Sequence, residues 1–379
     1  MPGSIRARKP GVWQIRVSAG RDLITGRYRT VTETVYGTEA QAKRAAARLQ
    51  TRVSEGQQAV SAATLSTLLE AWIDALEKRG RAPKTVLEYR HLGKVISDSL
   101  GKFRLRKLTV TQIEAFYGGL RARGLAPGTV RHYHATLCAA LRQAVRWGWL
   151  DRSPMERVEP PSVDYEEPAA PTVDEVQRLI AAADAKNPSL ASFLFVAATT
   201  GCRRGELCGL QWGDLQLDEP AHIVVRRSIS SLPGRLEVRS TKTGRVRRLA
   251  LDVATVGVFR RQCELAEERC RALGTVLAKD AYVWSQEADH SRPWSPDRVT
   301  DAFRNLRGRL DLPHLRLHHF RHFAATIMLA GGVDVRTAAG RLGHSQPAIT
   351  LRTYAHVLDA PDRVAADLLG SLVGGGRNT

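Results

Sequence analysis

A cluster of prolines divides this 379-residue chain into two parts. Within residues 151–171 the prolines are Pro154, Pro160, Pro161, Pro168 and Pro171. Because proline lacks a backbone N–H and its ring clashes with the preceding helical turn, we expect no helix through this stretch. We therefore assign residues 153–171 to a linker between domains. A chain of this length is also expected to form two or three domains rather than one.

Residues 1–56 are predicted to form a small basic module. Residues 11–17 and 27–36 alternate apolar and polar side chains, as half-buried strands do. Thr38, with Gln41 three residues later, predicts the capping box of a following helix. Arginines on a sheet face suit a DNA groove, so we expect DNA contacts here; the alternative is a solvated hairpin whose arginines bind nothing specific. The candidate residues are Arg16, Arg27 and Arg29.

Residues 63–152 are predicted to form a helical domain. The apolar residues of its first helix recur three and four positions apart, which places them on one face toward a core. They are Leu65, Leu68, Leu69, Trp72, Ile73 and Leu76. Thr109 and Gln112 predict another capping box. One side of the domain is basic, and is either an ordinary solvated surface or one that follows DNA phosphates. Its candidate DNA-binding residues are Lys84, Arg90 and Lys107.

A larger domain is predicted over residues 172–379. Thr172 and Glu175 form the capping box of its first helix. The rest is mainly helical in pattern, with strands expected at residues 222–229 and 236–251. The predicted fold class is therefore α+β, mainly α with small β-sheets, in three domains.

The formal net charge of +19 predicts a polyanionic partner and salt-sensitive binding. An anionic membrane surface and a ribosomal environment are the alternatives on charge alone. The apolar runs are too short to span a bilayer, so no membrane association is expected. The five cysteines show no metal-ligand spacing and no secretory signal opens the chain, which predicts a reduced, cytoplasmic location and no metal site.

The motif His318-x-x-Arg321 suggests a site for a phosphate. Residues three apart share one face of a helical turn, where an imidazole and a guanidinium can hold phosphate oxygens together. His344 follows, and Tyr354 lies ten residues after it. A phenol beside a phosphate pocket suggests a covalent nucleophile. We therefore infer phosphoryl transfer through tyrosine as the hypothesis to test.

Further candidates precede this motif. Metal-free cleavage of a phosphodiester needs cations on the nonbridging oxygens and a proton donor for the leaving alkoxide. Arg203 and Glu206 follow an apolar helix, and Lys242 lies beside a tight turn in a predicted hairpin. Arg204 is expected to be a solvated or DNA-facing neighbour, and Arg245 of the same hairpin is a further DNA-binding candidate.

These motifs together resemble the tyrosine recombinase (phage integrase) family. The family pattern is Thr-Gly-x-Arg-x-x-Glu, a lysine in a β-hairpin, His-x-x-Arg, Leu-Gly-His, and a tyrosine nine or ten residues later. All five elements occur here in that order; the one departure noted is Phe320, where the family usually has leucine. The resemblance implies a SAM-like core-binding domain before the catalytic domain. The additional N-terminal module resembles the arm-binding domain of an integrase from a phage or integrative element.

The resemblance also implies a role for each motif residue. Arg203 and Arg321 would clamp the scissile phosphate, and Tyr354 would attack it to give a 3′-phosphotyrosine. Lys242 would protonate the 5′ oxygen, while the two histidines assist proton transfer and Glu206 supports the site from behind. The implied catalytic set is Arg203, Lys242, His318, Arg321, His344 and Tyr354.

The implied partners are double-stranded DNA attachment sites, bound by a homotetramer on two of them. A directionality factor and a host DNA-bending protein are further partners that such an integrase can use, and no metal or other cofactor is expected. Two alternatives are a catalytically silent DNA-binding or architectural protein of the same fold, and a housekeeping chromosome-resolving recombinase.

Overall fold

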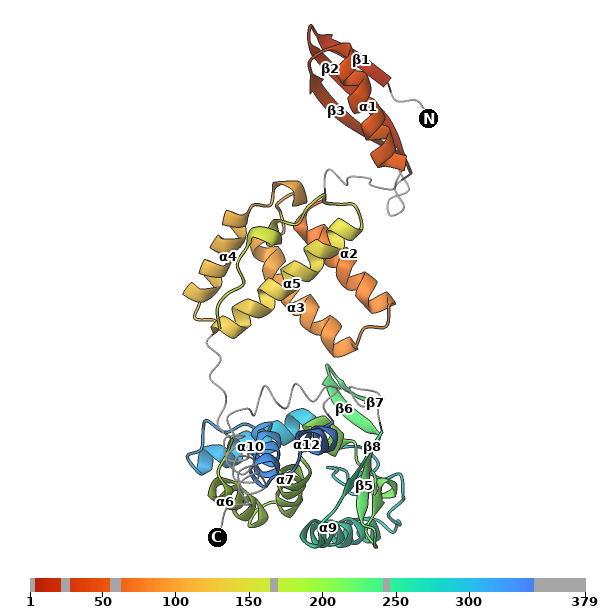
Figure 1. Cartoon of the computed structure of the whole chain (residues 1–379). Helices are drawn as coiled ribbons and strands as arrows, with labels where there is room; N and C mark the ends of the chain where they lie inside the picture. The colour runs from red at the N-terminus through yellow and green to blue at the C-terminus, as the bar shows by residue number, and fades with distance from the viewer. Residues whose placement is uncertain (1–3, 22–27, 55–62, 164–169, 241–245, 344–379) are drawn as a thin grey trace, which may run out of the picture. The chain divides into compact units, whose positions relative to one another are not determined.

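The computed structural model describes residues 4–21, 28–54, 63–163, 170–240 and 246–343 (Figure 1). The chain falls into two compact units, residues 1–165 and 166–379, which are described separately below. Over these residues the fold is mainly helical with small antiparallel sheets, which confirms the predicted class. None of the described helices is long and apolar enough to cross a membrane.

The N-terminal part of the first unit is a three-stranded antiparallel sheet covered on one face by a helix (Figure 1). The strands are β1 (Ser4–Lys9), β2 (Val12–Arg21) and β3 (Tyr28–Tyr36), and the helix is α1 (Glu39–Ser54). Ile15 and Val17 of β2 pack against Ala46 and Leu49 of α1 in a small core. The predicted capping box at the start of α1 is confirmed, since Thr38 N–H donates to Gln41 Oε1 at 2.8 Å and Gln41 N–H donates to Thr38 Oγ1 at 3.4 Å. β1 was not expected from the sequence, because half of its six residues are basic and few of its side chains are apolar.

The rest of the first unit is a bundle of helices around its own core. The helices are α2 (Leu65–Lys78), α3 (Pro83–Leu100), α4 (Val110–Ala122) and α5 (Pro127–Arg146), with a 3-10 turn at Leu105–Lys107. The predicted apolar face of α2 is buried from Leu65 to Ile73. The capping box of Thr109 and Gln112 is also confirmed.

Part of the expected linker belongs to this bundle. Residues 154–157 form a 3-10 turn with proline in its first turn, so the expectation of no helical structure after Asp151 was wrong at this point. Met155 and Val158 are 8% and 5% exposed and join the bundle core. A short 3-10 turn needs few backbone hydrogen bonds, so the missing N–H groups of the prolines cost little here. The burial of two apolar side chains is then enough to stabilise the turn.

The second unit surrounds one almost fully buried helix. Its helices are α6 (Val173–Asp184), α7 (Pro188–Thr200), α8 (Arg204–Cys208), α9 (Val253–Ala272), α10 (Pro296–Arg309), α11 (His319–Ala330) and α12 (Val335–Leu342). α7 is apolar on all sides, which suits a helix that neighbours cover completely. Phe193 of α7 packs edge-on against Trp284, with ring centroids 5.0 Å apart.

The strands of this unit form two small sheets, with the order β4-β5-β8 in one and β6-β7 in the other. They are β4 (Leu215–Gln216), β5 (His222–Val225), β6 (Arg227–Leu232), β7 (Arg235–Ser240) and β8 (Arg247–Ala250). The two long strands expected from the sequence are thus each divided in two. β8 pairs with β5, which places the start of β8 opposite Val225 and close to the end of α7.

Gly201 marks the junction at which α7, α11 and α12 meet. Its φ of +63° lies in the left-handed region that favours glycine, and it ends α7. A Cβ added there would lie 2.5 Å from Leu342 Cδ2 and 3.2 Å from Ala324 Cβ. Both the backbone conformation and the close approach of α11 and α12 therefore require glycine.

Gly201→Ala is expected to destabilise the protein by about 2–4 kcal/mol, because backbone strain and overpacking act together. Gly274→Ala is the matched control: it also has positive φ, but its added Cβ would meet no atom within 4 Å. Its expected cost is about 1 kcal/mol. The free energies of unfolding are measured by urea titration, and equal values for the two variants would contradict close packing at Gly201.

Candidate active site

Arg203 and Glu206 lie at the short connection between α7 and α8. The Arg203 backbone N–H donates to Glu206 Oε2 at 2.8 Å, and Arg203 Nη1 donates to Oε1 at 2.9 Å. The glutamate side chain is 1% exposed, whereas the arginine side chain is 28% exposed. A buried carboxylate therefore holds one edge of a guanidinium whose other side is partly open.

Arg321 approaches the same junction from the first turn of α11. It is 4% exposed, and its Nη1 donates to Gly201 O at 2.9 Å and to Leu342 O at 2.6 Å. Its Nη2 is buried and has no hydrogen-bond partner among the residues the structure describes. Desolvation, followed by the charge of Arg203, lowers the pKa of Arg321 to about 10, which leaves it cationic at neutral pH. A buried N–H donor of this kind calls for an anionic acceptor.

Both arginines also hold the end of α12. Arg203 Nη2 donates to Gly343 O at 3.2 Å, beside the bond from Arg321 to Leu342 O. Gly343 ends the helix with a φ of +71°, and cations are favourable at a helix C-terminus. His344, the next residue, and Tyr354 lie outside the described residues.

His318 precedes α11 and lies beside the arginines. Its ring centroid is 5.1 Å from that of His322, in an edge-to-face arrangement. Desolvation, followed by the charges of His322, Arg321 and Arg203, lowers the pKa of His318 to about 4. The cationic neighbours Arg203 and Arg321 thus disfavour a further positive charge on the ring. At neutral pH the imidazole is therefore uncharged and can accept or relay a proton.

A third arginine of the site was missed by sequence reasoning. Arg247 at the start of β8 donates to both carboxylate oxygens of Glu206, at 2.6 and 3.0 Å. Although burial opposes it, hydrogen bonds and charge from Arg247, then from Arg203, hold the pKa of Glu206 below its ordinary value. The glutamate of the motif was the available signal, because a buried carboxylate is stabilised by more than one cation. The sequence has several arginines near residue 247, however, and does not show which of them pairs with Glu206.

The structure thus brings together four of the predicted residues: Arg203, Glu206, His318 and Arg321. Lys242 falls outside the described residues, in the segment that joins β7 to β8. Within the described ranges there is no group of three or more His, Cys, Asp or Glu residues that could hold a metal ion. The arrangement offers cationic and neutral donors for a phosphate, grouped around one buried carboxylate.

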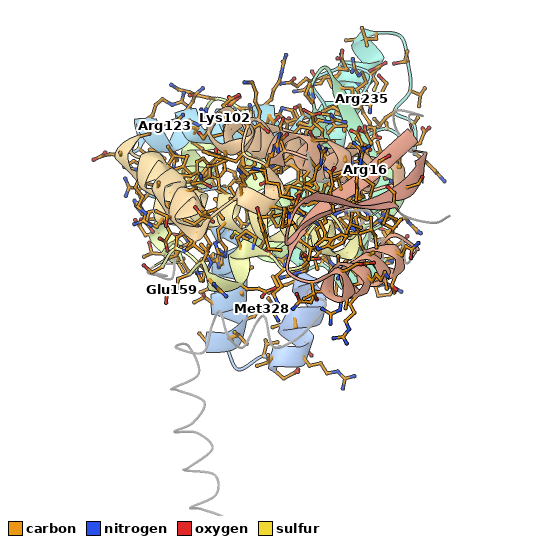
Figure 2. All side chains as sticks on the ribbon, turned by 90° about the horizontal axis from the view of Figure 1, so that it is seen from above. Arg16, Lys102, Arg123, Glu159, Arg235 and Met328 are labelled. Carbon is orange, nitrogen blue, oxygen red and sulfur yellow. The ribbon has the colours of Figure 1, made fainter. Side chains whose placement is uncertain are left out.

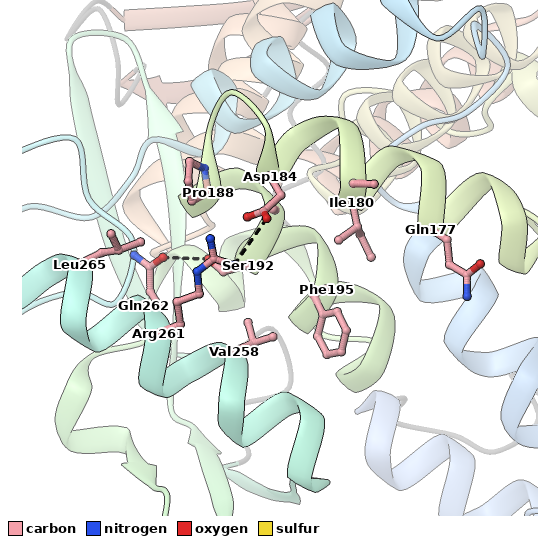
Figure 3. Close-up of a pocket in the computed structure, with 12 residues that line it drawn as sticks. Gln177, Ile180, Asp184, Pro188, Ser192, Phe195, Val258, Arg261, Gln262 and Leu265 are labelled. Atoms are coloured by element: carbon pink, nitrogen blue, oxygen red, sulfur yellow. Dashed lines mark hydrogen bonds and ion pairs between the residues drawn. The ribbon is translucent and has the colours of Figure 1, made fainter.

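An apolar hollow of about 310 Å³ lies elsewhere in this unit, between α6, α7 and α9 (Figure 3). Ile180, Phe195 and Val258 line it, and Asp184 pairs with Arg261 at 3.4 Å beside it. Its lining includes no residue of the predicted catalytic set, and its apolar character does not suit a phosphate.

The predicted DNA-binding residues differ in whether their side chains are exposed or paired with other side chains. Lys84 and Lys107 are exposed on the bundle, but Arg90 pairs with Glu77 at 2.5 Å and with Asp74 at 3.5 Å. Arg204 donates to Thr300 Oγ1 and lies 3.8 Å from Asp297, so it is held against α10. Arg27 and Arg245 lie outside the described residues, as does the side chain of Arg29.

The face of the N-terminal sheet opposite α1 carries basic residues that were not predicted. Arg16 is exposed on β2 (Figure 2), and the strand register places Arg6 beside Gln14 on the same face. Arg8 Nε donates to Gln14 Oε1 at 2.9 Å. The residues whose register assigns them to this face are Ser4, Arg6, Val12, Gln14, Arg16, Ser18, Thr30, Thr32, Thr34 and Tyr36, none of them acidic. β1, which the sequence did not reveal, supplies the additional arginines.

Comparisons with known proteins show what the chain as a whole is similar to. A profile of the phage integrase family matches residues 171–360, and a profile of the phage integrase SAM-like domain matches residues 64–159. The ICEBs1 integrase of Bacillus subtilis (strain 168) is 27% identical over 372 residues, which cover 98% of this chain and 100% of that protein.

Two solved structures share the fold. The Tn1549 transposon integrase in complex with a circular intermediate DNA aligns with a TM-score of 0.69 and 19% identity, over 80% of this chain and 99% of that one. A lambda integrase dimer bound to a COC' core site aligns with a TM-score of 0.61 and 18% identity, over 93% and 95% of the two chains.

In an NMR titration of the DNA-free protein, the His318 ring is expected to titrate near pH 4 rather than near the ordinary histidine pKa of about 6.5. Because the folded-state pKa is lowered, the penalty for charging this ring is absent above pH 6.5 and grows as the pH falls toward 4. The signal is assigned by its loss in His318→Gln. A His318 pKa of 6.5 or higher would contradict the cationic surroundings, whereas a rise upon addition of DNA is expected.

Proposed function

Because the chain belongs to the phage integrase family of tyrosine recombinases, we propose that it is a site-specific integrase that acts through a 3′-phosphotyrosine at Tyr354. Members of this family cleave and rejoin DNA. The observation that best supports the proposal is the buried Arg321 Nη2, which has no acceptor within the described part of the chain. A nonbridging oxygen of a DNA phosphate is an acceptor of the right charge and geometry for it.

The proposed reaction exchanges one phosphodiester for another. Tyr354 Oη attacks the scissile phosphorus, and the bond from phosphorus to the 5′ oxygen breaks. Lys242 gives its proton to that oxygen, which leaves as a 5′ hydroxyl. Arg203 and Arg321 bind the nonbridging oxygens and stabilise the charge that grows on them. Rejoining is the reverse reaction with the 5′ hydroxyl of a partner strand, so the phosphoester bond is conserved at each step.

Two histidines complete the proposed site. Neutral His318 receives the proton of the tyrosine hydroxyl as Tyr354 attacks, and it adds no charge to the site before the substrate arrives. His344 follows directly upon Gly343, whose carbonyl Arg203 holds. The arginines that bind the phosphate therefore also anchor the chain immediately before this second imidazole.

We also propose that the substrate is the attachment site of a mobile element. The full-length match to the ICEBs1 integrase and the additional N-terminal sheet favour this over a housekeeping resolvase. In this proposal residues 1–56 bind arm-type DNA sites, residues 63–152 bind the core site, and residues 172–379 carry the chemistry, with residues 153–171 between them. A homotetramer acts on two sites, and a directionality factor and a host DNA-bending protein set the direction.

The covalent step is tested with nicked DNA fragments taken from the region that flanks the gene. Wild type in EDTA is expected to give an SDS-resistant protein–DNA band, which Tyr354→Phe abolishes while DNA binding is kept. Tyr89→Phe is the matched control, because the Tyr89 ring packs on Trp72 and the change keeps the ring. If wild type binds one fragment tightly without a covalent band, the protein is a silent DNA-binding member of the fold.

The sheet face is tested by its salt-dependent affinity. Arg6→Ala and Arg16→Ala are each expected to weaken DNA binding at low salt by about 3- to 10-fold and to reduce the slope of log K against log salt by about 1. Arg48→Ala, on the exposed side of α1 in the same module, is the control. Filter binding or fluorescence anisotropy over a salt series provides the measurement, and an equal loss in Arg48→Ala would contradict a DNA-binding role of this face.

A further inference from the structure

We propose that Arg247 is a positioning residue, which fixes the phosphate-binding Arg203 through their shared partner Glu206. The inference rests on the proposed function and concerns the same site. Arg247 is the first residue of β8, and its side chain is 11% exposed. It belongs to none of the motifs that the sequence singled out.

The hydrogen bonds of Glu206 are divided evenly between the two arginines. Oε1 accepts from Arg247 Nη1 at 3.0 Å and from Arg203 Nη1 at 2.9 Å. Oε2 accepts from Arg247 Nη2 at 2.6 Å and from the Arg203 backbone N–H at 2.8 Å. A carboxylate has about four acceptor positions, so the carboxylate is saturated and cannot rotate without losing a bond.

Arg247 does not compete with Arg203 for the substrate. Both of its terminal nitrogens are bound to Glu206, and Nη2 also lies 3.6 Å from Cys202 Sγ. Its Nε is buried, with no partner among the described residues. Arg203, in contrast, is 28% exposed. The geometry therefore assigns the phosphate to Arg203 and the supporting role to Arg247.

Arg247 also contacts the end of α12. A Cβ added to Gly343 would lie 2.7 Å from Arg247 Nη1, so the guanidinium lies directly against the backbone there. The Gly343 carbonyl is in turn an acceptor for Arg203 Nη2. Arg247 thus supports Arg203 on one side and, on the other, the backbone that leads to His344.

Arg247→Lys keeps the charge but replaces the planar fork by a single ammonium, which cannot bind both carboxylate oxygens in the same way. With a nicked DNA fragment that wild type cleaves, we expect covalent complex formation to slow by about 10-fold or more, while DNA affinity changes by less than about 3-fold. The melting temperature is expected to change by less than about 3 °C, because the charge pair with Glu206 remains. Arg248→Lys is the control: Arg248 is the next residue on β8, exposed, with Nη2 3.0 Å from His222 Nδ1.

A double-mutant cycle separates positioning from general support. If Arg247 acts through Arg203, then Arg247→Lys should slow cleavage by less than about 3-fold in a protein that already carries Arg203→Lys. The reason is that the two substitutions impair the same interaction, which is lost only once. Effects that multiply would overturn the inference, as would a wild-type cleavage rate in Arg247→Lys.

The experiment also separates this inference from the proposed function. If wild type forms no covalent complex, the proposed function fails; if wild type cleaves and Arg247→Lys cleaves equally, only the inference fails. Should Arg247→Lys melt more than about 8 °C below wild type, Glu206→Gln is measured instead, since it removes the charge that joins the two arginines. A wild-type cleavage rate in Glu206→Gln would then overturn the inference.

Discussion

The site depends on one buried carboxylate. Glu206 is 1% exposed and accepts hydrogen bonds from both Arg203 and Arg247. Burying such a charge alone would be very unfavourable, and the two guanidinium groups make it acceptable because they bind it on both oxygens. The converse also holds, since two arginines packed close together need an anion between them. Glu206 is thus the group that allows several cations to gather at one place.

The balance of charge at this place explains why it suits a phosphodiester. Three guanidinium groups, those of Arg203, Arg247 and Arg321, lie around a single carboxylate, so positive charge is in excess before any substrate binds. Desolvation is the first cause of the lowered pKa of Arg321, and the charge of Arg203, which is part of this excess, is the second. A DNA phosphate removes part of the excess and supplies an acceptor for Arg321 Nη2. The overall basicity of the chain attracts DNA, but this local excess selects one phosphate.

Sequence reasoning reached this site only in part, for a physical reason. Motif spacing predicted Arg203, Glu206, His318 and Arg321, because the members of each motif lie three residues apart in the sequence. Arg247 stands among several basic residues of similar local pattern. Its burial depends on the pairing of β5 with β8, which places it opposite Val225, and no local pattern records that pairing. The arginines of β1 were missed for a different reason, because this short strand has few apolar side chains to indicate it. Lys242, His344 and Tyr354 remain predictions.

The same contacts join the chemistry to the stability of the fold. Arg321 Nη1 binds the carbonyl oxygens at the ends of α7 and α12, and Arg203 Nη2 binds the next carbonyl after α12. These bonds hold two helix ends in the absence of DNA, so the nitrogens that bind backbone are ordered before the substrate arrives. Each guanidinium uses one edge for the protein and keeps other N–H groups for an anion. The pair Arg203 and Arg321 is therefore preorganised by the packing of α7 against α11 and α12. Substitutions of these two arginines should disturb both folding and cleavage. Arg247 is the residue at which the two effects can be separated.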